Sequence, residues 1–180
     1  MICGPSNCST AHLQGSHNTI VGALAWEQGV SGSHNTMIGA AAGQNVSKGN
    51  EQVFIGWEAG SNLQDSCGNI AIGSHAANAG TGNTNIAIGR ESMFSASGDH
   101  NIAIGHRSLY AASGDYNIAL GFNVASSSSD ISHSIVFNAS DSSLDPSSNR
   151  FYVQPIALAT KENALYYEPS TYEITWGLSC

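Results

Sequence analysis

Short apolar triplets recur along most of the chain at a nearly constant spacing, and a glycine closes each of them. In the cleaner copies the triplet is Ile-Ala-Ile, as at 70–72, 86–88 and 102–104. The closing residues are Gly22, Gly39, Gly56, Gly73, Gly89, Gly105 and Gly121, with Asn138 in the eighth position. Their spacings of 17, 17, 17, 16, 16, 16 and 17 residues indicate a solenoid in which each repeat forms one coil.

The unit is too short for two helices and a turn, and its Gly-Asp, Gly-Asn and Ser-Gly pairs favour short strands. We therefore predict an all-β fold, a β-solenoid of about eight coils over residues 15–140. Coils stacked at the strand spacing of about 4.8 Å give a rod roughly 40 Å long. Polar side chains directly before the triplets are expected to hydrogen-bond along a column or to cap turns. This column contains Asn18, Asn35, Gln52, Asn69, Asn85, Asn101, Asn117 and Ser134.

Both faces of the triplet strands are apolar, which predicts burial on both sides. Alternation sends the two outer residues of a triplet to one side and the middle residue to the other. We assign the outer residues to the coil interior: Ile70, Ile72, Ile86, Ile88, Ile102, Ile104, Ile118 and Leu120. The small middle residues, Ala71, Ala87, Ala103 and Ala119, would then face other copies of the chain around an axis. An obligate oligomer is expected.

The segments "GDHNIAIGHRS", "GNTNIAIGRES" and "GDYNIALGFNV" resemble the head repeats of trimeric autotransporter adhesins, the YadA-like heads. The resemblance covers residues 15–140 and implies a left-handed parallel β-roll assembled as a homotrimer. Here Asn takes the place of the family's Ser before the triplet, and the three N-terminal coils carry bulkier middle residues. The export signal, heptad stalk and membrane anchor of a complete adhesin are not recognisable.

The segments outside the repeat are divided by composition. Residues 1–14 are expected to form an N-terminal arm, and the Ser, Asp and Pro content of 141–149 predicts a linker. Aromatic, strand-like runs at 150–180 predict a small C-terminal β-module. This last segment resembles the terminal β-module of fibre and surface proteins of large DNA viruses.

Charge and composition narrow the classes of function. Charged residues are 10% of the chain and the net charge is −8, from 13 acidic and 5 basic side chains. No cluster of Lys or Arg offers a groove for phosphates, so we expect no nucleic-acid binding. With no apolar run of about 18 residues, membrane insertion is not expected either.

Candidate chemistry is weak throughout. We expect no metal site at Cys3, Cys8, Cys67 and Cys180, which lack zinc-ligand spacing, or in the column of His17, His34, His100 and His133. Around a three-fold axis that column would supply three imidazoles, but Glu51, Gly68, Thr84 and Tyr116 share it. No GxSxG turn is present, so neither catalytic residues nor a cofactor are expected. The aromatic residues Trp26, Trp57, Phe94 and Tyr110 would either fill the coil and pack within the solenoid or form a stacking surface for sugars or a partner, and we favour filling and packing.

Together these features predict a non-enzymatic structural or attachment protein, a homotrimeric fibre or spike head on the surface of a virus particle. Its partners would be other virion proteins or a host receptor or glycan. Outward side chains such as Arg90, Glu91, His106 and Arg107 would be free for recognition. The alternatives are a bacterial or phage-encoded adhesin head that binds matrix protein or glycan at a cell surface, and a minor capsid protein that cements other subunits.

Overall fold

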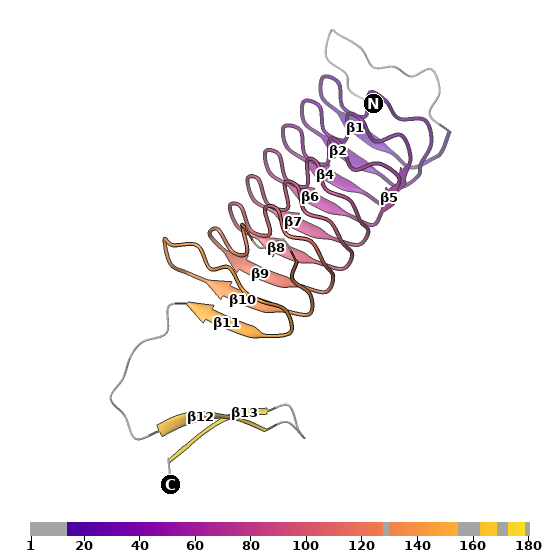
Figure 1. The fold of residues 1–180 in the computed structure, drawn as a ribbon. Helices are drawn as coiled ribbons and strands as arrows, with labels where there is room; N and C mark the ends of the chain where they lie inside the picture. The colour runs from indigo at the N-terminus through magenta and orange to yellow at the C-terminus, as the bar shows by residue number, and fades with distance from the viewer. Residues whose placement is uncertain (1–13, 128–129, 155–162, 169–172, 179–180) are drawn as a thin grey trace.

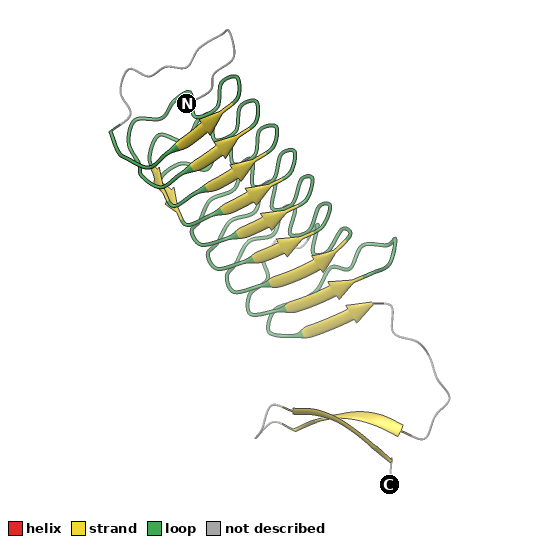
Figure 2. Cartoon of the chain, turned by 180° about the vertical axis from the view of Figure 1, so that it is seen from behind, coloured by secondary structure: helices red, strands yellow, loops and turns green. Residues whose placement is uncertain are grey.

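The computed structural model describes residues 14–127, 130–154, 163–168 and 173–178. None of these residues is helical, and most of them form coils stacked into a rod (Figure 1). One nine-stranded parallel sheet runs the length of the rod (Figure 2). Its strands, in order, are β1 (Thr19–Val21), β2 (Thr36–Ile38), β4 (Val53–Ile55), β6 (Ile70–Ile72), β7 (Ile86–Ile88), β8 (Ile102–Ile104), β9 (Ile118–Gly121), β10 (Ile135–Asn138) and β11 (Phe151–Gln154).

The strands pair in the register that the repeat predicts. Ile86 of β7 lies opposite Ile70 of β6 and opposite Ile102 of β8, so equivalent residues stack in columns. A second sheet of two short strands, β3 (Gly49–Asn50) and β5 (Ser66–Cys67), joins two N-terminal coils on another side. The predicted β-solenoid is thus confirmed, whereas its left-handedness stays a prediction.

The sheet extends one coil further than predicted. β11 continues the sheet from β10 with Phe151 opposite Ile135 and Gln154 opposite Asn138, at the same 16-residue spacing. Between them Leu144 bridges to Val124, and the side chain of Ser148 accepts a hydrogen bond from the Ser132 N–H (3.0 Å). Residues 141–149 are therefore not a linker but part of a coil, and residues 150–154 belong to the solenoid.

The C-terminal strands lie where the aromatic runs predicted them. β12 (Asn163–Glu168) pairs antiparallel with β13 (Glu173–Leu178). The predicted arm at 1–14 falls, except for Gln14, outside the described residues, as do Cys3, Cys8 and Cys180. A compact C-terminal module stays a prediction.

Turns between strands use backbone conformations that most residues avoid. The seven closing glycines have φ between 126° and 135°, a region open only to glycine. Two and four residues later the chain enters the left-handed region again, for example at Arg107 (φ 56°) and Leu109 (φ 51°). The amides of these turns bond to the next coil, as from the Leu109 N–H to the Val124 carbonyl (2.8 Å). Each coil is therefore stabilised mainly by its neighbours.

The polar column before the triplets forms a hydrogen-bonded ladder inside the rod. The Asn117 N–H donates to Oδ1 of Asn101 (2.9 Å), and Nδ2 of Asn101 donates to the Gly114 carbonyl (2.9 Å). Related bonds recur along the column, from Asn18 to Ser134. The predicted structural role of these amides is confirmed.

Replacing Asn101 with Ala is expected to destabilise the fold by about 3 kcal/mol, because it leaves buried groups of Asn117 and Gly114 without partners. The matched control is Asn62→Ala, since Asn62 is exposed and its side chain bonds only to the side chains of Asn45 and Asn78. Its loss should cost under about 0.5 kcal/mol. Urea unfolding followed by circular dichroism compares the two, and equal losses would contradict the role given to the buried ladder.

Candidate interaction surfaces

Side chains alternate along each strand between a buried column and an exposed face. The residues that we predicted to be inside lie on the exposed face, and those that we predicted to face other copies are buried. Ala71, Ala87, Ala103 and Ala119 are at most 1% exposed within a single chain, so they line the coil interior. Ile104 is 40% exposed and Ile38 is 36% exposed, on the outer side of the same sheet. The residues predicted to fill the coil therefore point outward. They are Ile70, Ile72, Ile86, Ile88, Ile102, Ile104, Ile118 and Leu120.

The physical reason is the narrow interior of the coil, where two columns share a fixed volume. In two coils a large middle residue is matched by glycine six positions later: a β-carbon on Gly43 would strike Met37, and one on Gly60 would strike Phe54. Where the middle residue is Ala103, the sixth position is the buried Leu109. This exchange of volume is typical of a close-packed core. It leaves no room inside for the isoleucine columns.

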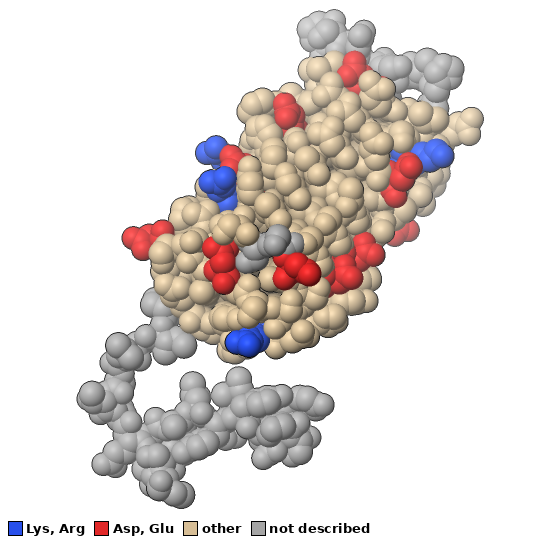
Figure 3. All heavy atoms as spheres, viewed as in Figure 1, with Lys and Arg blue, Asp and Glu red and all other residues tan. Residues whose placement is uncertain are grey.

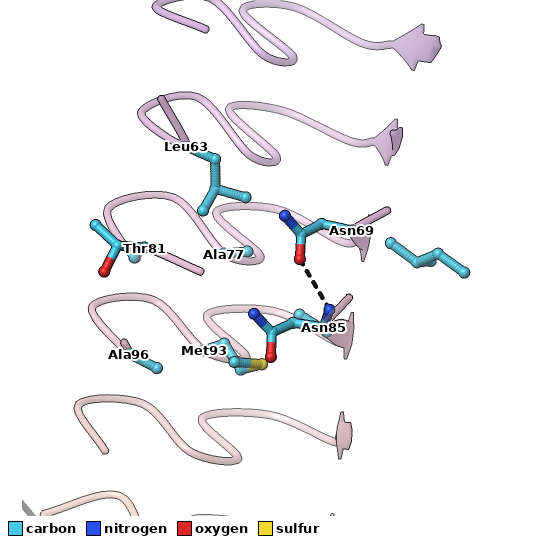
Figure 4. A pocket seen from close by; sticks show the side chains of 10 residues that line it. Leu63, Asn69, Ala77, Thr81, Asn85, Met93 and Ala96 are labelled. Atoms are coloured by element: carbon cyan, nitrogen blue, oxygen red, sulfur yellow. Dashed lines mark hydrogen bonds between the residues drawn. The ribbon is translucent and has the colours of Figure 1, made fainter. Parts of the chain in front are cut away.

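A small void lies in the described interior. Its volume is about 10 Å³, and it is lined by Ala77, Ala87 and Met93 and by Asn69 and Asn85, whose hydrogen bond is drawn in Figure 4. Such a volume holds one water molecule at most. It is a packing defect, not a ligand site.

The outer side of the nine-stranded sheet forms the first candidate surface, which we call the apolar face. It runs about 40 Å along the rod at the usual strand spacing. Its N-terminal end is the more polar, with Thr19 and Thr36, and its C-terminal end carries Phe137 (37% exposed) and Phe151 (53% exposed). Monomeric proteins seldom expose a continuous apolar patch of this length. The face therefore has the character of a protein–protein contact.

A column of exposed residues in the left-handed conformation borders the start of the strands. The rings of His17 and His34 stack at 4.8 Å, and Tyr116 stacks between His100 and His133 at 5.0 and 5.2 Å. Within the described residues no three His, Cys, Asp or Glu side chains gather as metal ligands. The column shows ring stacking between coils.

The aromatic residues divide between the interior and the surface. Trp26 is 3% exposed and its Nε1 donates to the Val46 carbonyl (2.8 Å), so it fills the coil as predicted. Trp57, in contrast, is 55% exposed, and the rings of Phe94 and Tyr110 stack on the outside at 5.2 Å. Coil filling is therefore wrong for Trp57, whereas the stack of the half-buried Phe94 and Tyr110 is the packing between coils that was also expected.

Charged side chains are sparse on the rod, and much of its surface is uncharged (Figure 3). Four outward positions singled out from the sequence lie close together. Glu91 pairs with Arg90 (2.7 Å) and with Arg107 (3.3 Å), and the ring of His106 stacks on Phe122. Together with Trp57, Phe94 and Tyr110 they lie on turns after the closing glycines and form the second candidate surface.

Cys67 is exposed and has a free thiol. No described helix is long and apolar enough to cross a membrane. No family model, curated protein or solved structure matches this chain.

Proposed function

We propose that the protein is a non-enzymatic rod that assembles as a homotrimer through the apolar face and serves display or attachment on the surface of a virus particle. The single observation that carries the assembly is the exposed set of Ile, Phe and Val side chains on one side of the sheet. Burying such a side chain is worth about 1.5–3 kcal/mol, which favours covering the face with other copies. The resemblance of the repeats to YadA-like heads supports three copies.

The role in display rests on the rod itself. Ladders of backbone and Asn hydrogen bonds fix each coil on the next, which suits a stiff projection from a surface. The virion as the site of display rests on the resemblance of residues 150–180 to the terminal modules of viral fibre proteins.

Replacing Ile104 with Asp tests the assembly, because Ile104 is 40% exposed in one chain and would be covered in the oligomer. A carboxylate buried in every copy of the interface should lower the assembled fraction at least tenfold. Sedimentation velocity measures this fraction. Ser95→Asp, an exposed site off the apolar face, is the control and should assemble normally.

The proposed location is tested on intact particles with an antibody raised against the purified rod. Gold labelling of undisrupted virions in the electron microscope is the expected result. Labelling only after disruption would favour the cementing role, and no labelling in either state would contradict a virion component.

A further inference from the structure

Six side chains outside the apolar face form one connected surface along the rod, which we call the aromatic–arginine strip. Its members follow the closing glycines of four consecutive coils by one, two or five positions. They are Trp57, His75, Arg90, Phe94, Arg107 and Tyr110. None of them is needed to explain the coil or the proposed assembly.

The aromatic part of the strip is continuous from coil to coil. Trp57 contacts the edge of His75 (ring centroids 4.5 Å apart), and His75 lies 6.1 Å from Phe94. The rings of Phe94 and Tyr110 are parallel within 6°. Nε2 of His75 lies 3.3 Å from Oε2 of Glu58, and Nδ1 of the same ring is hydrogen-bonded to the Ser74 hydroxyl (2.9 Å). The half-exposed Trp57 ring therefore stands beside fixed neighbours.

The charged part of the strip carries a local excess of positive charge. Arg90 and Arg107 share a single carboxylate, that of Glu91, and the Arg107 guanidinium lies 4.4 Å above the Tyr110 ring. This pair stands out in a chain with only 5 basic residues and a net charge of −8. Two guanidinium groups with one counter-charge suit a carboxylate or sulfate, which Arg binds through paired N–H groups.

Hydrogen bonding at this end of the strip is incomplete. Nδ1 of His106 and Oδ1 of Asn123 are buried and lack a hydrogen-bond partner, and the buried Nε of Arg107 has only its 3.3 Å ion-pair contact with Glu91; the three residues lie on adjacent coils. No other described side chain shows such an atom. Buried polar atoms are normally paired, so a ligand that reorders these side chains would remove the deficit.

We infer that the strip binds an acidic glycan that lies along the rod axis, with sugar rings stacked on the aromatic side chains and a carboxylate or sulfate at Arg90 and Arg107. The inference rests on the proposed function, because attachment is the activity that it serves. Four coils at about 4.8 Å span the length of a short oligosaccharide. Amphipathic rings with one exposed side suit the C–H faces of sugars.

An extended peptide fits the strip less well. Backbone amides that would pair with a peptide strand already bond to the next coil, as from the Ser95 N–H to the Tyr110 carbonyl (2.8 Å). A peptide therefore cannot bind here by adding a strand to the sheet, whereas a ligand can still stack on the rings and pair with the Arg side chains.

The test is retention of the whole protein on an array of immobilised neutral, sialylated, uronate-containing and sulfated glycans, followed by calorimetry with the retained glycan. Trp57→Ala and Arg107→Gln should each weaken binding at least tenfold. The matched controls are Tyr116→Ala, an exposed ring off the strip, and Arg150→Gln, an exposed Arg on another coil. Both controls should bind as the unchanged protein does, and binding should weaken with added salt.

Retention of neutral glycans alone, no retention, or equal losses in strip and control variants would overturn the inference, as would retention of a peptide ligand in place of a glycan. Circular dichroism and sedimentation of each variant separate lost binding from lost folding or assembly. Particles that display the rod while the rod retains no acidic glycan would refute this inference and leave the display proposal standing.

Discussion

Replacing Gly105 with Ala is expected to destabilise the fold by about 4 kcal/mol or more. Gly105 has φ 126°, outside even the left-handed helical region that other residues enter. A β-carbon there would also strike the backbone carbonyl of Gly121 on the next coil. Because that carbonyl belongs to the stacked sheet, it cannot move aside without breaking the register. Denaturant unfolding followed by circular dichroism measures the loss.

A second glycine provides the control. Gly68 has φ 69°, in the column where His34 (φ 63°) and His100 (φ 59°) adopt the same conformation. A β-carbon on Gly68 would lie 3.7 Å from Oγ1 of Thr84, an ordinary contact. Gly68→Asn should therefore change the free energy of unfolding by under about 1 kcal/mol. If Gly105→Ala proved no more harmful than Gly68→Asn, the role assigned to the closing glycines would be wrong.

Replacing Ala103 with Asp is expected to abolish folding of the surrounding coils. Ala103 is fully buried between Ala87 and Ala119 and is packed in the interior that Leu109 also fills. A carboxylate placed there has no partner and should cost about 3–5 kcal/mol, on top of the clash from its larger volume. The measurement is the far-ultraviolet circular dichroism spectrum and its melting transition.

The neighbouring substitution shows which side of the strand is inside. Ile104→Asp changes the adjacent residue but points to the apolar face, so it should impair assembly more than it impairs the coil. A folded Ala103→Asp protein that failed only to assemble would contradict the buried position of Ala103 and would favour the assignment made from the sequence, with alanine facing the partner subunits.

The repeat predicted most of the architecture because its signal is redundant. Columns of closing glycines and buried Asn residues recur in most coils, and each matches a backbone requirement that the structure contains. Ala and Ile in the triplets are both apolar, however, so alternation separates two faces without saying which is inside. The column six residues after the middle residue of each triplet helps to decide which face is inside. Phe54 is followed there by Gly60, and Ala103 by Leu109. In these two coils the large residue of one column is paired with the small residue of the other, which indicates that the two columns share the interior.

The last coil was missed because its residues are atypical for the repeat. Arg150 stands in the buried Asn column, and Tyr152 takes the inward position of the triplet. Ser148 and Asn149 nevertheless keep the repeat's pattern, since Asn149 has φ 58° in the left-handed column. The candidate surfaces are harder still to predict from the sequence. Arg107 contacts Tyr110, which lies 3 residues later in the same turn, and no sequence motif marks such a contact.

The most direct test of the account is the mass of the purified protein in solution, measured by light scattering after size-exclusion chromatography under reducing conditions. The proposed homotrimer predicts a mass of three chains that persists on dilution to low micromolar concentration. A stable, well-folded single chain, with the whole apolar face in water, would contradict the assembly on which the proposed function depends.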